Sequence, residues 1–275
     1  MIRLENNEHW LLLGHADHAA LAGEFARHWK NDRFAPPNPF AHILDAVSRH
    51  DDSWKERDAE PELTPEGHPS AFSRELVGTY EAFEEIDLPA YLAVRGRATE
   101  QAAVRDPYSA VLISMHTVNL LTEQADPDTL DAEGKVLLNA FVAGQRNRQT
   151  ELLASLAGSG MNPEFLTPEA LRRGFEFLQA CDSFSLLVGV DYPGCSALRH
   201  RHPFGAEDAV EIVYEPLGNR RYRLDPWPLD EPELVFDIPY RRVAKSATHT
   251  LEAFRAAYAQ ADVEPVRIVV TGETS

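Results

Sequence analysis

The stretch "ILDAVSRHDDSW" (43–54) combines the apolar spacing of a buried helix with ionisable residues near its end. At about 100° per residue, Ile43 and Val47 share one helical face with His50. An imidazole and the adjacent Asp51 carboxylate would therefore lie where apolar side chains are expected. A carboxylate is almost never fully buried without a partner, because removing a lone charge from water costs much free energy. The stretch therefore predicts a nearby cation.

Three further segments, 18–29, 106–125 and 167–190, show the helical spacing of apolar residues. The second and third each open with a capping Asp or Thr followed by Pro, which is a common helix start. On their apolar sides these segments carry His18, His116 and Asp182. Ionisable groups therefore recur at core positions of separate predicted helices.

The predicted metal ligands are His18, His50, Asp51, His116 and Asp182. Neutral imidazoles and carboxylates suit Fe, Mn, Zn, Ni or Co, and helical bundles often hold such ions between facing side chains. One divalent ion or two would satisfy the set. A single buried His is more often a hydrogen-bonded core residue, so the prediction rests on the whole set and requires residues 50 and 182 to meet.

The residues after the His-Asp pair are predicted to form the edge of the site. Asp52, Trp54, Lys55 and Asp58 are the predicted substrate-binding residues. The following text, from about 55 to 89, is rich in Pro, Gly and acids and predicts a long loop. Long loops in compact domains often form lids or pocket walls.

The chain of 275 residues is long enough for one sizeable core with an appendage. We predict a mainly α fold, an HD-like helical bundle with a small β-rich C-terminal addition, α+β overall. The expected domains are residues 1–195, helical and metal-binding, and residues 196–275, β-rich and packed on it. A Gly-Asn turn at 218–219 between alternating segments predicts a hairpin there, and residues 1–14 read as a short strand or edge segment.

Composition excludes several function classes. A net charge of −18 disfavours broad nucleic-acid binding. No apolar run approaches the roughly 18 residues of a membrane span. Two cysteines and no leader-like N-terminus favour a cytoplasmic protein. The expected partner is a small-molecule substrate, and a homo-oligomer is left open.

In this order, the segments "DHAALAGEFA", "HILDAVSRHDDSW" and "LQACDSFSLL" resemble the His … His-Asp … Asp pattern of HD-domain metal-dependent phosphohydrolases. More narrowly, about residues 1–245 resemble the uncharacterised HD-like family DUF3891, in the motifs "HDDSW", "LISMHTVNLL" and "CDSFSLL". The resemblance implies that His18, His50, Asp51 and Asp182 ligate one metal. His116 resembles the additional histidines of two-metal members, which include diiron oxygenases.

The expected function is metal-dependent hydrolysis of a small anionic, phosphorylated substrate. A metal would activate water by lowering its pKa toward neutrality, with Asp51 and His116 as the expected catalytic residues. Two alternatives stay open. A diiron oxygenase requires a second complete ligand set, and a non-catalytic metal-stabilised sensor or scaffold requires a closed coordination sphere.

Overall fold

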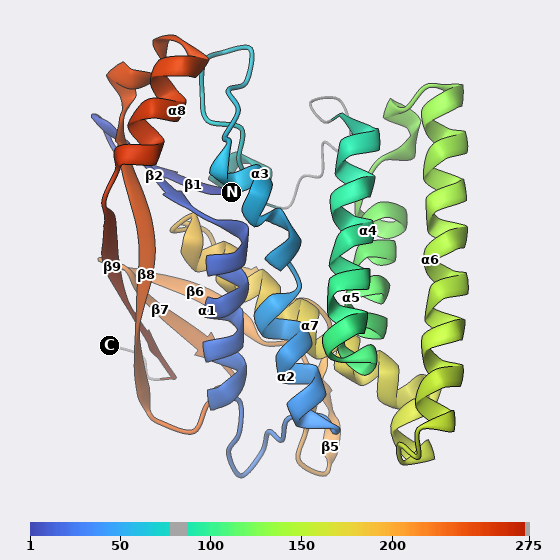
Figure 1. The fold of residues 1–275 in the computed structure, drawn as a ribbon. Helices are drawn as coiled ribbons and strands as arrows, with labels where there is room; N and C mark the ends of the chain where they lie inside the picture. The colour runs from blue at the N-terminus through green and yellow to red at the C-terminus, as the bar shows by residue number, and fades with distance from the viewer. Residues whose placement is uncertain (78–86, 273–275) are drawn as a thin grey trace.

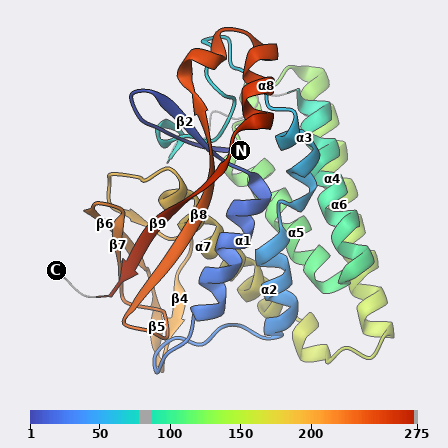
Figure 2. The same cartoon turned by 60° about the vertical axis from the view of Figure 1, so that its left-hand side comes forward.

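A curled seven-stranded sheet packs against a cluster of helices (Figures 1 and 2). The computed structural model describes residues 1–77 and 87–272. The helices are α1 (His15–His28), α2 (Phe40–Arg49), α3 (Lys55–Ala59), α4 (Leu88–Arg105), α5 (Pro107–Asn119), α6 (Ala132–Gly158), α7 (Pro168–Gly189) and α8 (Leu251–Gln260). The strands are β1 (Ile2–Glu5), β2 (His9–Leu13), β3 (Ser196–Ala197), β4 (His202–Phe204), β5 (Glu207–Val210), β6 (Val213–Gly218), β7 (Arg221–Asp225), β8 (Glu233–Ala244) and β9 (Val263–Thr271).

The prediction of a mainly α bundle with a small β addition is wrong. The sheet runs in the order β1-β2-β8-β9-β7-β6-β3, with β7 and β9 parallel and the other neighbours antiparallel. The fold is therefore α+β around a mixed seven-stranded sheet, with β4 and β5 pairing as a separate two-stranded sheet. The sheet takes strands from both sides of the predicted boundary at residue 195, and the division into two domains stays a prediction.

Strand β2 explains why the sheet was underestimated. Leu11 and Leu13 belong to the main core, whereas Trp10 and Leu12 pack with Phe254 of α8 on the other face. Because both faces are covered, the run "WLLL" lacks the alternation that marks a half-buried strand. Residues 1–14 were predicted as a short strand or edge segment; they form two strands, and β2 is internal, paired with both β1 and β8.

The helix starts at Asp106 and Thr167 are confirmed. The Asp106 carboxylate accepts hydrogen bonds from the backbone N–H groups of Tyr108 and Ser109, at 3.0 and 3.2 Å. The Thr167 hydroxyl accepts one from the N–H of Ala170. Side chains thus satisfy backbone donors in the first turns of α5 and α7. No helix within the described ranges is long and apolar enough to cross a membrane.

Helices α1, α2 and α7 lie side by side between the sheet and the outer helices (Figure 1). Two glycines permit this close approach. A Cβ on Gly23 of α1 would lie 2.1 Å from the Ser48 hydroxyl of α2. A Cβ on Gly174 of α7 would lie 3.2 Å from Leu112 and 3.3 Å from Ile43. Gly23 therefore lets α1 approach α2 closely, and Gly174 leaves room on α7 for the side chains of Ile43 and Leu112.

Candidate metal centre

The structure brings all five predicted ligands into one buried cluster. His18 lies in the first turns of α1, His116 in the last turn of α5 and Asp182 in the middle of α7. His50 and Asp51 follow the end of α2 and lie in the turn that leads to the short helix Asp52–Trp54. Each of the five is at most 8% exposed. The sequence placed the His-Asp pair inside a longer helix, but the chain turns there.

Hydrogen bonds fix the orientation of the His50 imidazole. Its Nδ1 donates to the backbone oxygen of Val47 at 2.8 Å, so Nε2 is turned into the cluster. Nε2 lies 3.3 Å from an oxygen of Asp182, yet among the described residues no partner is aligned to hydrogen-bond with it. A buried, unpartnered nitrogen that faces a carboxylate is a fit for a cation.

His18 has the same arrangement. The Ser185 hydroxyl donates to the backbone oxygen of Asp182 at 2.8 Å, so it accepts from Nδ1 of His18 at 2.9 Å. The Nε2 lone pair of His18 then faces Oδ2 of Asp51 at 3.1 Å. Two acceptors at this distance repel each other unless a proton or a metal lies between them.

His116 completes a second group of donors. Its Nε2 lies 3.9 Å from Oδ2 of Asp182. Two trios therefore have ligand atoms within 4.8 Å of one another, namely His18, His50 and Asp51, and His50, His116 and Asp182. The buried His/Asp cluster could hold a metal ion.

The pKa values show how strongly the cluster needs positive charge. Burial alone would lower the pKa of His50, but Asp51 and Asp182 outweigh burial and raise it to about 9. Burial likewise opposes ionisation of Asp182, yet the neighbouring imidazoles, His50 first, hold its pKa well below the usual range. His116 behaves differently, because burial lowers its pKa to about 3. Without metal, a proton on His50 supplies the charge that a cation would otherwise supply.

Sequence reasoning missed Arg95, a buried side chain of α4. Its Nη1 donates to Oδ1 of Asp51 at 2.7 Å, and with His50 it holds the pKa of Asp51 well below the usual range against the effect of burial. The guanidinium carbon lies 5.2 Å from the Trp54 ring centre and 5.3 Å from that of Tyr91. The sequence offered one indication, Tyr91 four residues before Arg95, on the same face of a helix. A single Arg on a helix is usually a surface residue, so this spacing did not predict burial.

The cluster opens onto a cavity of about 1080 Å³. His18, Asp51, His116 and Asp182 lie in its wall, with His50 behind them. Much of the remaining wall comes from the segment predicted as a long loop, residues 55–89. Another part is the π-helical turn Leu120–Gln124, which follows α5. Residues 78–86 of that loop lie outside the described residues. The cavity is at the upper end of the usual range for ligand sites, so it has room for a molecule larger than inorganic phosphate.

The four predicted substrate-binding residues separate into two pairs. Trp54 and Asp58 line the cavity. The Trp54 ring stacks on the His15 ring, with 4.4 Å between the ring centres. The Asp58 carboxylate accepts a hydrogen bond of 2.6 Å from the backbone N–H of His15, at the start of α1. Asp52 and Lys55 form an ion pair of 2.9 Å and are not among the residues that line the cavity.

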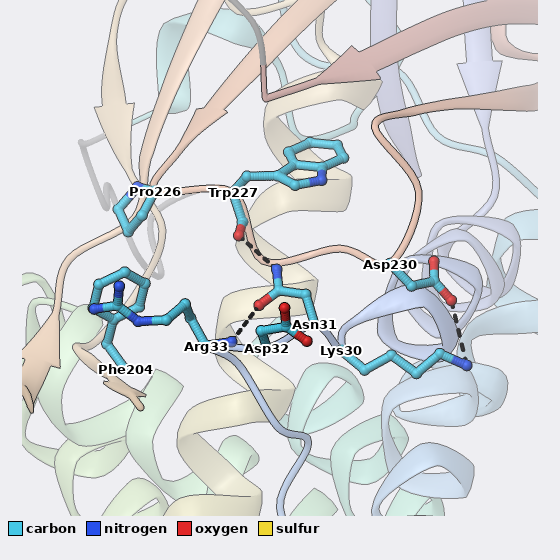
Figure 3. Close-up of a pocket in the computed structure, with 8 residues that line it drawn as sticks. All are labelled: Lys30, Asn31, Asp32, Arg33, Phe204, Pro226, Trp227 and Asp230. Carbon is cyan, nitrogen blue, oxygen red and sulfur yellow. Dashed lines mark hydrogen bonds and ion pairs between the residues drawn. The ribbon is translucent and has the colours of Figure 1, made fainter. Parts of the chain in front are cut away.

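A second, shallow hollow of about 700 Å³ lies away from the cluster (Figure 3). The Asn31 side chain donates to the backbone oxygen of Trp227 at 2.8 Å, and Lys30 pairs with Asp230 at 3.3 Å. Arg33 lies over a phenyl ring and pairs with a glutamate. Its cationic side chains are already engaged by neighbours, so the His/Asp cavity is the candidate site.

Fold and site together define an α+β protein with a buried His/Asp cluster that could hold a metal. The family model described as "Protein of unknown function (DUF3891)" matches residues 1–245, and the chain belongs to this family. Searches of the curated proteins and of the solved structures found no significant match.

Proposed function

We propose that the protein is an HD-type metal-dependent hydrolase that acts on a phosphoester or a similar anionic substrate. One observation carries the proposal. The Nε2 atoms of two imidazoles, His18 and His50, face two carboxylates inside the protein, and this cluster forms the wall of a large cavity. A purely structural cluster would need no cavity beside it, and a closed metal site would leave no open position for a substrate.

Different residues of the chain would bind the ion, orient its ligands and contact the substrate. His18, His50, Asp51 and Asp182 would hold the ion, and Val47 and Ser185 fix the orientation of the two imidazoles. A bound divalent transition metal would supply a Lewis acid and an activated water. His116, largely neutral because its pKa is lowered to about 3, would accept a hydrogen bond or join a second ion at the cavity wall.

The assignment to the HD type draws on the order of the ligands along the chain. His18, the His50-Asp51 pair and Asp182 follow the His … His-Asp … Asp pattern, and all four meet in one cluster. The curled sheet is additional to the helical bundle expected of that type. The proposal therefore rests on the cluster and not on the overall fold.

The trio of His50, His116 and Asp182 favours a second candidate function. Nε2 of His50 can bind only one ion, so the pair of ions that an HD-type diiron oxygenase requires would divide the two groups, with His116 and Asp182 holding the second ion. Such an enzyme would bind two irons per chain and consume oxygen with its substrate. A hydrolase would turn over substrate at the same rate without oxygen.

Metal analysis followed by a phosphoester panel tests the proposal. The full chain is purified without a metal-affinity tag, and its metal content is measured before and after loading with Fe, Mn, Zn, Ni or Co. We expect one or two ions per chain and metal-dependent cleavage of a phosphomonoester or phosphodiester. His50→Ala and Asp182→Ala should lose the metal and the activity while circular dichroism shows a folded protein.

His28→Ala is the matched control, because His28 forms a 2.8 Å ion pair with Asp230 at the surface, away from the cluster. It should keep both metal and activity. Wild-type protein that stays metal-free after loading, together with an Asp182→Asn variant of full stability, would refute the metal site. Metal binding without turnover of any panel substrate would instead favour the sensor or scaffold function.

A further inference from the structure

Large apolar side chains line the cavity beside the metal cluster. We call this set the apolar wall; it consists of Phe72, Leu76, Val77 and Leu186. Each of the four side chains is only half-buried. Apolar side chains that stay partly exposed in a concave site gain free energy when an apolar group covers them, in proportion to the area removed from water. The apolar wall therefore fits an apolar part of a ligand.

Leu186 brings the apolar wall next to the predicted metal ligands. It follows Asp182 by four residues on α7, so the two side chains share one face of the helix, and both line the cavity. Side chains at this spacing have Cβ atoms about 5–6 Å apart. A substrate whose reacting group binds at the cluster would therefore have its neighbouring atoms within reach of Leu186.

Hydrogen bonds hold the other three residues of the apolar wall in place. The backbone N–H of Phe72 donates to the backbone oxygen of Met1 at 2.9 Å, and the backbone N–H of Arg3 donates to the backbone oxygen of Phe72 at 2.7 Å. The Arg74 guanidinium donates to the backbone oxygen of Val190, at the end of α7, at 3.2 Å. Residues 72–77 are thus fixed between β1 and α7, and a ligand would not have to order them on binding.

The charged residues of the cavity do not favour a substrate with several negative charges. Among the described residues that line it, nine carry a carboxylate and four are arginines. Two of these arginines already face carboxylates, since Arg3 lies 3.8 Å from Glu75 and Arg95 lies 2.7 Å from Asp51. A bound metal would add positive charge at the cluster alone. One anionic group can therefore bind there, whereas a polyphosphate would extend among carboxylates.

We infer that the substrate combines one anionic reacting group, bound at the metal, with an aryl or alkyl group that packs on the apolar wall. The inference rests on the proposed function and narrows its substrate class to esters of apolar alcohols, in place of nucleoside polyphosphates or sugar phosphates. The cavity of about 1080 Å³ has room for both groups. Leu186 and Phe72 are then specificity-determining residues.

The binding of two phosphonates tests this inference. Methylphosphonate and phenylphosphonate carry the same anionic group without a hydrolysable ester, and they differ in the size of the apolar group. Calorimetry measures the affinity of the full-length, Mn²⁺-loaded protein for each. We expect phenylphosphonate to bind at least about tenfold more tightly, because its ring covers apolar surface. The wild-type protein decides this comparison without any substitution.

Leu186→Asn then tests the place of the apolar group, because it keeps the approximate size of the side chain and makes it polar. It should weaken phenylphosphonate binding at least about fivefold, and leave Mn²⁺ and methylphosphonate binding within about twofold of wild type. Leu137→Asn is the matched control, since Leu137 of α6 is 38% exposed and is not among the residues that line the cavity. It should change none of the three affinities.

Wild-type protein that takes up Mn²⁺ but binds the two phosphonates equally, or binds neither, overturns the inference. An equal loss of Mn²⁺, methylphosphonate and phenylphosphonate binding in Leu186→Asn also overturns it, because a merely structural role would produce that result. The metal site of the wild type stands in each of these cases. Wild-type protein that binds no metal refutes the proposed function as well, so the two failures are distinguishable.

Discussion

The protonation of His50 makes the stability of the metal-free protein depend on pH. The folded-state pKa of His50 is raised to about 9 from an ordinary value of 6.5. A raised pKa means that the folded state binds a proton more tightly than the unfolded chain. The resulting stabilisation is fully present below pH 6.5 and is lost as the pH rises through about 9.

The size of the effect follows from the shift. One pKa unit corresponds to about 1.4 kcal/mol, so this residue contributes about 3 kcal/mol at pH 6. The His50 side chain is fully buried, so solvent screening does not reduce this contribution. Between pH 6.5 and 9 the free energy of unfolding should therefore fall by about 3 kcal/mol through His50 alone. His116 does not contribute in this window, because its pKa is lowered to about 3.

Urea denaturation of metal-free wild type and of His50→Gln, at pH 6, 7, 8 and 9, measures this loss. The difference between the two proteins isolates His50 from every other titrating group. Metal-loaded wild type should not show this loss between pH 6.5 and 9, because a ligating imidazole is deprotonated throughout that range. Metal binding at pH 7.5 should also release about one proton, measurable by calorimetry in two buffers of different ionisation enthalpy. Parallel pH profiles for the two metal-free proteins would refute the reasoning.

Three further predictions concern the packing that positions the cluster, each measured by urea or thermal unfolding. Gly23→Ala should destabilise the protein by about 2 kcal/mol, because its Cβ would lie 2.1 Å from the Ser48 hydroxyl. Gly144→Ala, where nothing lies within 4 Å, should instead stabilise it by up to about 1 kcal/mol, and equal effects at the two glycines would contradict the close packing of α1 on α2. Phe184→Ala should cost about 4 kcal/mol, since that ring is fully buried and stacks on a neighbour at 4.1 Å; a loss below 1 kcal/mol would argue against the α1–α7 contact. Thr167→Ala should cost about 1 kcal/mol by removing the cap of α7, whereas Thr167→Ser should cost little.

Local signals predicted helices α1, α2, α5 and α7 and the five ligand residues of the cluster, whereas α3 and α4 were not predicted. Caps such as Thr167 act on the next few residues and are therefore visible in the sequence. Asp182 could be recognised from the sequence because a carboxylate is unexpected in an apolar stripe. In the structure its Oδ1 lies 3.3 Å from Nε2 of His50. The pattern did not show that the chain turns at His50, since one further helical turn has the same apolar spacing.

Contacts between residues far apart in the chain could not be predicted from the sequence. The pairing of β2 with β8 joins residues near opposite ends of the chain, and no local pattern identifies the partner strand. Arg95 was missed for a related reason. Its burial depends on Asp51, Trp54 and Tyr91 meeting around it, and only Tyr91 lies on the same helix.

The pairing of β2 with β8 also has a consequence for biosynthesis. Trp10 emerges from the ribosome about 230 residues before Val243, the residue opposite it in the sheet. Such distant pairing slows folding and leaves an unpaired apolar edge on the nascent chain. We expect chaperones to be needed until residues 233–244 have left the exit tunnel, and slow codons placed before that point should increase aggregation.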